Sequence, residues 1–251
     1  MQIVFLTALG VGGATAIGAA IGFLFKKMTH KFSDISLSFA AGIMLAAAIF
    51  GLIIPSLEYG GKYQSIIVTV LGIFAGAVVM NLIDKLVPHL HQLAGEDGES
   101  HPDTNLNKVM LFVIAIAIHN LPEGIAAGVS FGTDNLTQAF LIAGGIALHN
   151  IPEGMATIGP MLNAGISMKK AFIYALITGL VEVVGVLIGY FAVNIASAVL
   201  PFALAFAGGT MIYIVSDEII PETHAHGSER GATYALLAGF CVMLVFEVLL
   251  G

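Results

Sequence analysis

A six-residue motif containing metal-ligating side chains occurs twice in the chain. It reads His-Asn-Leu-Pro-Glu-Gly at residues 119–124 and His-Asn-Ile-Pro-Glu-Gly at residues 149–154. Imidazole, amide and carboxylate groups are costly to place in lipid, yet both copies lie inside apolar stretches. The repetition of such a set in apolar surroundings predicts that these side chains bind a ligand, and a cation fits their chemistry best.

Helical spacing brings the polar side chains of each motif together. His119 and Glu123 are one helical turn apart and share a face, with Asn120 beside that face. Three residues of the second copy repeat the arrangement: His149, Asn150 and Glu153. Both motifs fall near the middle of their apolar stretches. Because successive membrane spans run antiparallel, we expect the two copies to meet in one site at the midplane, with two imidazoles and two carboxylates.

The alternative for the motifs is a pair of packing helices bent at Pro122 and Pro152, with His–Glu hydrogen bonds. Two copies at matching depth favour binding over packing. Glu182 lies in another apolar stretch, so its carboxyl group must be protonated, paired or bound to a cation. We favour the cation over a structural hydrogen bond. Imidazole combined with carboxylate suits zinc, iron and manganese better than sodium or potassium.

The composition places these motifs in a membrane. Hydrophobic residues make up 58% of the 251 residues, charged residues only 10%, and the mean hydropathy is +0.97. The sequence therefore predicts an all-α polytopic membrane protein with a single transmembrane domain over residues 1–251 and a longest polar connection at 88–107. Eight stretches are long and apolar enough to span a bilayer: 3–25, 35–57, 65–87, 108–131, 137–162, 168–192, 201–220 and 232–250.

The basic residues predict how the chain is oriented in a cell membrane, because cytoplasmic loops collect positive charge. Of nine Lys and Arg residues, only Lys62 falls on the other side of the eight-span arrangement. Both termini are then external. Four connections are cytoplasmic: 26–34, 88–107, 163–170 and 221–231. The single cysteine, Cys241, permits no intrachain disulfide, and the net charge of −7 argues against nucleic acid as a partner, which leaves lipid and small cations.

The paired His-Asn-x-Pro-Glu-Gly motifs, the sparsely charged helices and the eight-span layout closely resemble the ZIP (Zrt-, Irt-like protein) family of divalent-metal transporters, and within it the prokaryotic GufA-like branch. The resemblance implies a binuclear metal centre, a homodimer, and an inverted repeat of spans 1–3 with spans 6–8 around spans 4 and 5. It assigns eight residues to the centre, the last of them a thioether contact: His119, Asn120, Glu123, His149, Asn150, Glu153, Glu182 and Met44.

The family pattern differs from this chain at one position. Some members carry Gln-Asp or Gln-Asn in place of His149-Asn150, so here the second metal position has less negative charge and the first has an added imidazole. The resemblance also suggests a transport path, for which solvated helix ends are the alternative. Its entrance is Glu58 and Glu247. Its exit is Glu218, the deepest of four residues that include Asp217, Glu222 and His224.

Together these features predict a transporter that moves a divalent transition metal into the cytoplasm. Zinc is the first candidate, with iron, manganese and cadmium left open, and no organic cofactor is expected. The chain has no Gly-x-x-x-x-Gly-Lys-Ser loop, so ATP is not the energy source, and the family's repeat suggests an elevator or rocking motion. The loop at 88–101 contains three histidines and three acidic residues. It either senses metal or is a plain linker, and the sequence does not distinguish the two.

Two other function classes could use the same residues: an intramembrane metalloprotease and a cation channel. An intramembrane metalloprotease needs His-Glu-x-x-His, in which the glutamate serves as general base. Asn120 and Asn150 occupy that place and cannot abstract a proton, so no enzyme is expected. A proton or monovalent-cation channel would use the same glutamates but has little need for so many nitrogen-bearing side chains.

Overall fold

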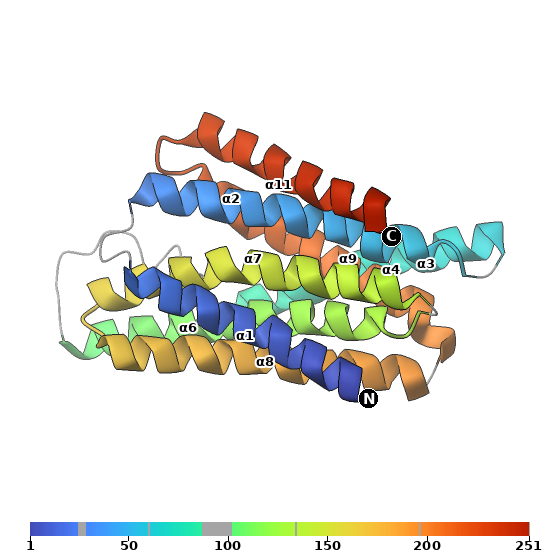
Figure 1. Cartoon of the computed structure of the whole chain (residues 1–251), viewed down its shortest axis with the longest axis horizontal. Coiled ribbons are helices and arrows are strands. Elements are labelled where there is room, and N and C mark those ends of the chain that lie inside the picture. Colours follow the sequence, from blue (N-terminus) through green and yellow to red (C-terminus); the bar gives the residue numbers. More distant parts are fainter. Residues whose placement is uncertain (25–28, 60, 87–101, 134, 196, 251) are drawn as a thin grey trace.

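The computed structural model describes residues 1–24, 29–59, 61–86, 102–133, 135–195 and 197–250. Within these ranges every regular element is a helix, which confirms the all-α prediction. Long helices lie side by side along one axis, with the termini toward one end of the bundle (Figure 1). The elements are α1 (Gln2–Leu24), α2 (His30–Ala46), η1 (Ala47–Ile53), α3 (Ile54–Ser56), α4 (Lys62–Leu86), α6 (Pro102–Ser130), α7 (Leu136–Asn163), α8 (Met168–Ile195), η2 (Ser197–Val199), α9 (Leu200–Ile214), η3 (Val215–Ile219), α10 (Ile220–Thr223) and α11 (Glu229–Leu250).

Two of the passes contain a π-helical segment. In one, α2 runs through η1 into α3 without a break, and in the other α9 runs through η3 into α10. Each π segment ends directly before an Ile-Pro pair, Ile54-Pro55 in the first pass and Ile220-Pro221 in the second. Counted in this way, the described residues make eight passes, which match the eight predicted stretches. π segments often mark functional positions in helices, and η3 carries Glu218.

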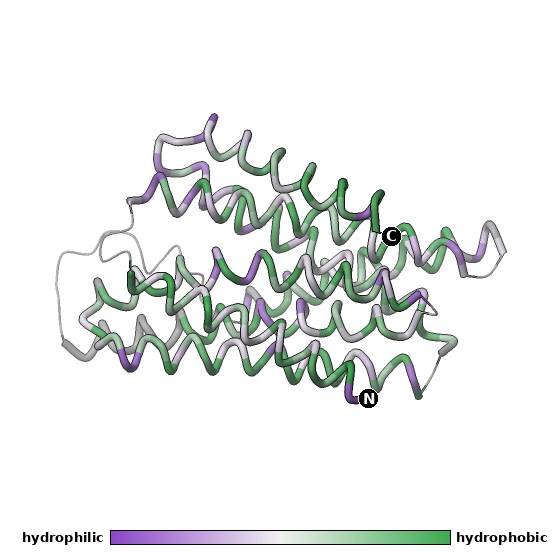
Figure 2. Tube along the Cα trace, in the orientation of Figure 1, coloured by the Kyte–Doolittle hydropathy of each residue, from purple (hydrophilic) through white to green (hydrophobic). Residues whose placement is uncertain are grey.

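The outer face of the bundle is apolar, as expected of a multi-pass membrane protein. Six of the described helical stretches are long and apolar enough to cross a bilayer; α6 and α7, which carry the polar motifs, are not among them. Large apolar side chains point outward, for example Phe74, which is 67% exposed, and Val248, which is 75% exposed. The helices are predominantly hydrophobic along their length, with short hydrophilic stretches inside the bundle (Figure 2).

The helices α1 and α8 are related by an internal repeat and cross at two glycines. A Cβ atom built on Gly12 would lie 2.2 Å from the carbonyl oxygen of Gly179, and one built on Gly179 would lie 2.3 Å from that of Gly12. The two backbones therefore touch, and only glycine permits this approach. Because each glycine contacts the other in the same way, a pseudo-twofold relation passes between α1 and α8.

The motif helices obey the same relation. Gly154 of α7 packs against the carbonyl of Thr15 in α1, and Gly124 of α6 packs against the carbonyl of Glu182 in α8. Likewise α2 packs on α11 as α9 packs on α4. These matched contacts confirm the inverted repeat of the first three spans with the last three around the two motif helices.

Several predicted connections are shorter than expected because helices begin earlier. The connection predicted at 88–107 ends before Pro102, where α6 begins; proline suits a first helical position, since its missing N–H has no helical acceptor there. Residues 87–101 lie outside the described part. The connection predicted at 26–34 ends at Thr29, whose hydroxyl accepts a hydrogen bond from the Phe32 N–H at 3.3 Å and caps α2.

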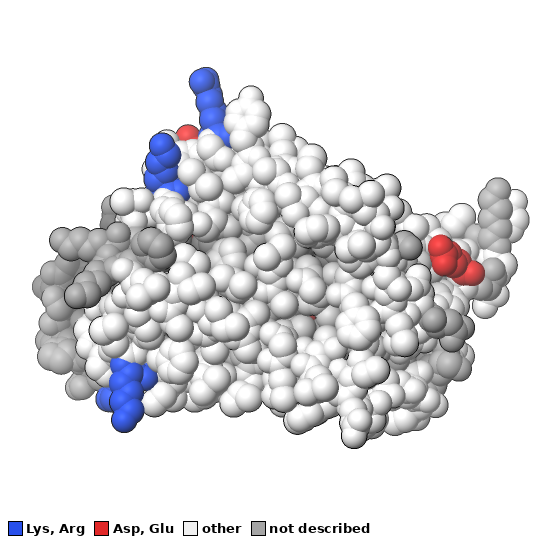
Figure 3. All heavy atoms as spheres, in the orientation of Figure 1, with Lys and Arg blue, Asp and Glu red and all other residues white. Residues whose placement is uncertain are grey.

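Charge is distributed unevenly between the two ends of the bundle. On the visible face, Lys and Arg side chains gather near the starts of α2, α8 and α11, at the end away from the termini (Figure 3). An acidic group is visible at the other end, beyond α3, and another lies between the basic side chains at the first end. The middle of this face is almost free of charge. On this face the charged side chains therefore lie at the two ends and leave the middle nearly uncharged, as a bilayer requires.

Candidate metal centre

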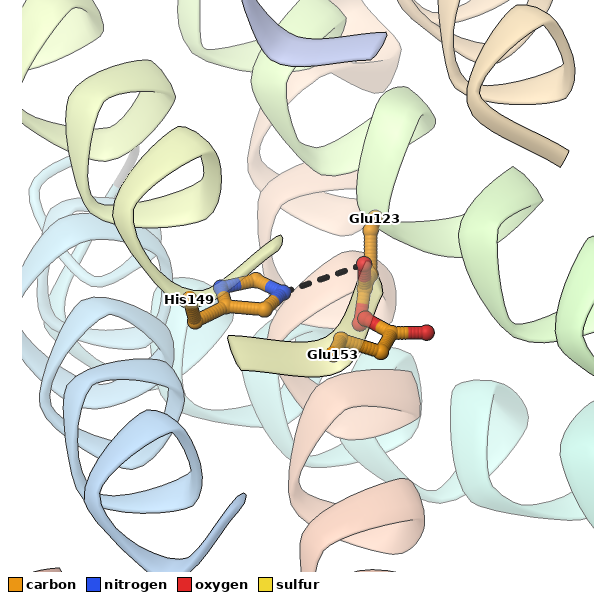
Figure 4. A group of neighbouring side chains, drawn as sticks. All are labelled: Glu123, His149 and Glu153. Atoms are coloured by element: carbon orange, nitrogen blue, oxygen red, sulfur yellow. Dashed lines mark ion pairs between the residues drawn. The ribbon is translucent and has the colours of Figure 1, made fainter. Parts of the chain in front are cut away.

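Three metal-ligating side chains converge in the interior, one from α6 and two from α7. One ligand atom from each of Glu123, His149 and Glu153 lies within 4.8 Å of the other two. His149 Nε2 is 3.1 Å from Glu123 Oε2, and both of these side chains are almost fully buried. The imidazole points toward the Glu123 carboxylate, with the Glu153 carboxylate beside it (Figure 4). One residue of the first motif and two of the second thus form a single cluster, as the predicted convergence of the motifs requires.

A glycine follows each motif glutamate and lets the motif helix pack closely against a neighbouring helix. Gly124 and Gly154 allow the backbones of α8 and α1 to approach closely, which presses both motif helices into the centre of the bundle. Pro122 and Pro152 lie inside helices that continue past them. Neither proline can donate an N–H to the carbonyl one turn earlier, so a backbone acceptor is freed beside each set of ligands. The bend expected at these prolines stays a prediction.

Several buried oxygen atoms around the cluster lack hydrogen-bond donors. Among the described residues, Asn120 Oδ1, Asn150 Oδ1 and Glu123 Oε2 are buried with no hydrogen bond. The ring nitrogen His149 Nε2 lies close to Glu123 Oε2 but is not aligned to donate to it. A buried acceptor left unsatisfied costs about 1–3 kcal/mol. Amide and carboxylate oxygens are natural metal ligands, so a cation bound here would satisfy each of these oxygens that it contacts.

Glu182 lies beside the cluster in a hydrogen-bond network. The hydroxyl of Thr15 and the Nδ2 amide of Asn120 each donate to Glu182 Oε1 at 2.7 Å. The Nδ2 amide of Asn150 donates to Glu182 Oε2 and also, at 3.2 Å, to the carbonyl of Val11. Glu182 thus receives three donors and orients both motif amides. Its predicted role as a metal ligand stays a prediction.

His119 lies apart from the three clustered residues and is paired with an expected exit residue. Its Nε2 contacts Glu218 Oε2 of η3, and the two side chains are 15% and 20% exposed. His119 and Glu218 both remain close enough to Glu153 to interact with it electrostatically. The predicted centre and the predicted exit are therefore in direct contact through this pair.

The other predicted residues are more dispersed. Met44 is buried in the core, and its part in the centre stays a prediction. Glu58 is exposed at the end of α3, and Asp217 and Glu222 are exposed on the pass through η3 and α10. The two ring nitrogens of His224 are occupied at the turn between α10 and α11, Nδ1 against the Ile220 carbonyl at 2.8 Å and Nε2 against the Thr233 hydroxyl at 3.1 Å.

Sequence reasoning missed two residues that contact the predicted site. Gln138, in the first turn of α7, donates from Nε2 to Glu247 Oε1 at 2.6 Å and so holds the predicted entrance carboxylate. Thr15 was missed although a signal was present. The spacing Gly-x-x-Thr-x-x-Gly at 12–18 matches Gly-x-x-Glu-x-x-Gly at 179–185, so the repeat itself places Thr15 opposite Glu182.

Comparison with known proteins agrees with this geometry. The profile of the ZIP zinc transporter family matches residues 91–247, which include both motifs and Glu182. The chain belongs to the ZIP family. The zinc transporter GufA of Myxococcus xanthus is 37% identical over 252 residues, covering 98% of each chain. The zinc transporter ZIPB of Bordetella bronchiseptica is 37% identical over 95% of this chain and 78% of its own length. The zinc transporter ZupT of Chlorobaculum parvum is 39% identical over 96% of this chain and 95% of its own.

Family membership distinguishes a transporter from an intramembrane metalloprotease. ZIP proteins are transporters rather than enzymes, so the metalloprotease alternative is excluded. The prediction of a ZIP-type transporter with an all-α membrane fold is confirmed. The asparagines that stand where a protease would carry its general base instead donate to Glu182.

Proposed function

We propose that this protein transports zinc into the cytoplasm and that Glu123, His149 and Glu153 hold the ion midway through the membrane. The observation that carries the proposal is the convergence of these three ligand atoms within 4.8 Å, inside a bundle with an apolar outer face. Relatives named as zinc transporters along nearly the whole chain support zinc as the substrate.

The ligand set suits a divalent ion of intermediate softness. Two carboxylates and a neutral imidazole supply two negative charges and three strong donor atoms, which leaves an open position on a four-coordinate zinc ion. His119 fills that position when it leaves Glu218, because it lies on the same helix one turn before Glu123. Asn120 and Asn150 supply amide oxygens, and Glu182 orients both amides from behind. Met44 lines the site and supplies a thioether sulfur, the softest of the proposed metal contacts.

The route runs from the end with the termini to the end with the basic side chains. Glu58 and Glu247 form the entrance, with Gln138 holding Glu247 in place. The ion leaves along Glu218, Asp217 and Glu222, on the pass that ends at the basic rim. This rim faces the cytoplasm, following the positive-inside rule, and both termini are external.

Transport follows an ion gradient without ATP. Since metal ligands must be deprotonated to bind, zinc binding at the centre releases protons, and those protons can leave on either side. The two repeat halves, one built on α1, α2 and α4 and the other on α8, α9 and α11, move relative to the motif helices to alternate access.

Two copies of the chain associate in the inner membrane as a homodimer.

Reconstitution tests this function directly. Purified protein in liposomes should take up zinc down an imposed zinc gradient with no nucleotide present, well above protein-free liposomes. Iron, manganese and cadmium added outside should compete in proportion to their affinity for the imidazole–carboxylate set. Zinc flux that required ATP, or flux no greater than in protein-free liposomes, would overturn the proposal.

A further inference from the structure

Outside the midplane centre, two histidines and a buried aspartate meet at the basic end of the bundle. His30 and Asp34 lie one turn apart at the start of α2, and His226 lies in the turn between α10 and α11. His226 Nδ1 is 3.1 Å from Asp34 Oδ1. The rings of His30 and His226 are stacked, with centroids 4.9 Å apart and planes inclined by 27°. The family resemblance assigned none of these residues a role.

The hydrogen bond to Asp34 determines which nitrogen of His226 is free. A carboxylate accepts and does not donate, so Nδ1 of His226 carries the proton and Nε2 keeps its lone pair. A carboxylate that orients a histidine through its far nitrogen is the usual second partner of a metal-bound imidazole. Asp34 is only 3% exposed, so it is a rigid anchor for the ring.

Asp34 also has an unsatisfied atom. Its second oxygen, Oδ2, is buried and has no hydrogen-bond partner among the described residues. An unsatisfied carboxylate oxygen in the interior costs free energy, so Asp34 depends on its hydrogen bond to His226. By contrast, both nitrogens of His224 are already hydrogen-bonded, although His224 is only two positions from His226. Among the described residues, the hydrogen bond of His226 uses only Nδ1, so the imidazole with an available nitrogen is on His226 and not on the residue that resembles the family exit.

We infer that His30 and His226 form a second site for a divalent metal ion, with Asp34 as the residue that positions His226. The ligands are Nε2 of His226 and one ring nitrogen of His30, whose ring turns out of the stack to direct its in-plane lone pair at the same ion, with water completing the coordination. Such nitrogen ligands select zinc and similar borderline cations over magnesium or calcium. An ion held there connects the start of α2 to the turn that follows α10, on the side where the proposed path ends. This site is separate from the midplane cluster.

Zinc protection of individual histidines tests the site. The full-length protein in detergent is treated with diethyl pyrocarbonate, which modifies free imidazoles, and each histidine is read by peptide mass spectrometry with and without zinc. Zinc should protect His30 and His226 together over the same concentration range. In His226→Ala, zinc should no longer protect His30. In Asp34→Asn, protection of both rings should require about 10–100-fold more zinc, since loss of an orienting partner weakens metal binding by that factor.

Two control variants separate this site from other effects. In His224→Ala, zinc protection of His30 and His226 should be unchanged. In Glu153→Gln, which impairs the proposed midplane centre, protection should also persist, so failure of the transport proposal is distinguishable from failure of this one. Protection of neither ring by zinc in the unaltered protein would overturn the inference. Equal protection of His30 in His226→Ala and in the unaltered protein would overturn it as well, because the two rings would not share an ion.

Discussion

The hydroxyl of Thr15 donates a hydrogen bond to the carboxylate of Glu182 at 2.7 Å, although the two residues are 167 positions apart. The two residues occupy equivalent places in the repeat. Thr15 follows Gly12 by three residues, Glu182 follows Gly179 by three residues, and the two glycines touch each other. The repeat is therefore symmetric in its backbone but not in its chemistry. One half supplies a carboxylate, and the other supplies a donor that holds it.

Replacing Thr15 by valine should destabilise the protein while leaving the metal ligands in place. Valine keeps the shape of threonine but removes one of three donors to a buried carboxylate, a loss of about 1–3 kcal/mol. The measurement is thermal unfolding in detergent. The matched control is Thr178→Val, since the Thr178 hydroxyl donates only to the Ala175 carbonyl of its own helix. A smaller loss in Thr15→Val than in Thr178→Val would contradict the role given to this hydrogen bond.

Replacing Glu182 by glutamine should weaken zinc binding less than the same change at Glu153. Glu182 acts on the ion through the amides of Asn120 and Asn150, whose unsatisfied oxygens let them rotate and accept from the new amide. We expect a loss of about tenfold for Glu182→Gln, within the range seen for orienting partners. Zinc affinity is measured by competition with a chelating dye. Equal losses in the two variants would instead make Glu182 a direct ligand.

Replacing Glu218 by glutamine should tighten zinc binding, because it releases His119 to join the centre. A partly exposed His–carboxylate pair is worth about 1 kcal/mol, which corresponds to roughly a fivefold gain in affinity. Release of zinc should slow at the same time, so the maximal uptake rate falls. Glu229→Gln is the control, since Glu229 is exposed in the first turn of α11 and lies outside the proposed path. A weaker affinity in Glu218→Gln would show that Glu218 assists binding directly.

Replacing Gly12 by alanine should force α1 and α8 apart. The added Cβ would lie 2.2 Å from the Gly179 carbonyl oxygen, a distance that backbone atoms cannot accommodate without moving. The control is Gly13→Ala, because a Cβ there meets nothing within 4 Å and alanine is favoured over glycine in helices by about 1 kcal/mol. We expect Gly12→Ala to lower the unfolding temperature and Gly13→Ala to keep or raise it. Similar behaviour of the two variants would contradict the close crossing.

The membrane passes and the meeting of the two motifs could be predicted from the sequence. Hydropathy located six of the passes, because the apolar length needed to cross a bilayer does not depend on tertiary contacts; the motif helices α6 and α7 are less apolar and were recognised as apolar stretches around the motifs. The motif spacing brought Glu123 together with His149 and Glu153, because helical periodicity and antiparallel packing determine that meeting. These predictions rest on local pattern alone.

The remaining features depend on contacts between distant segments. The pairing of His119 with Glu218 requires knowing how far η3 rotates the pass that carries it, and a π segment changes that rotation. The cluster at the basic end joins α2 to a turn near the end of the chain, and hydropathy carries no information about such a contact. Comparison of the glycine spacing in α1 and α8 would have revealed Thr15, because both helices follow the same pattern.

Zinc uptake by liposomes containing Glu153→Gln tests directly whether the midplane cluster holds the transported ion. The substitution keeps the size of the side chain but removes one of the two carboxylates that share the ion with His149. Glu229→Gln, an exposed position in the first turn of α11, is measured in parallel at equal protein density. We expect Glu229→Gln to transport like the unaltered protein and Glu153→Gln to fall to the level of protein-free liposomes. Undiminished uptake by folded Glu153→Gln would contradict it.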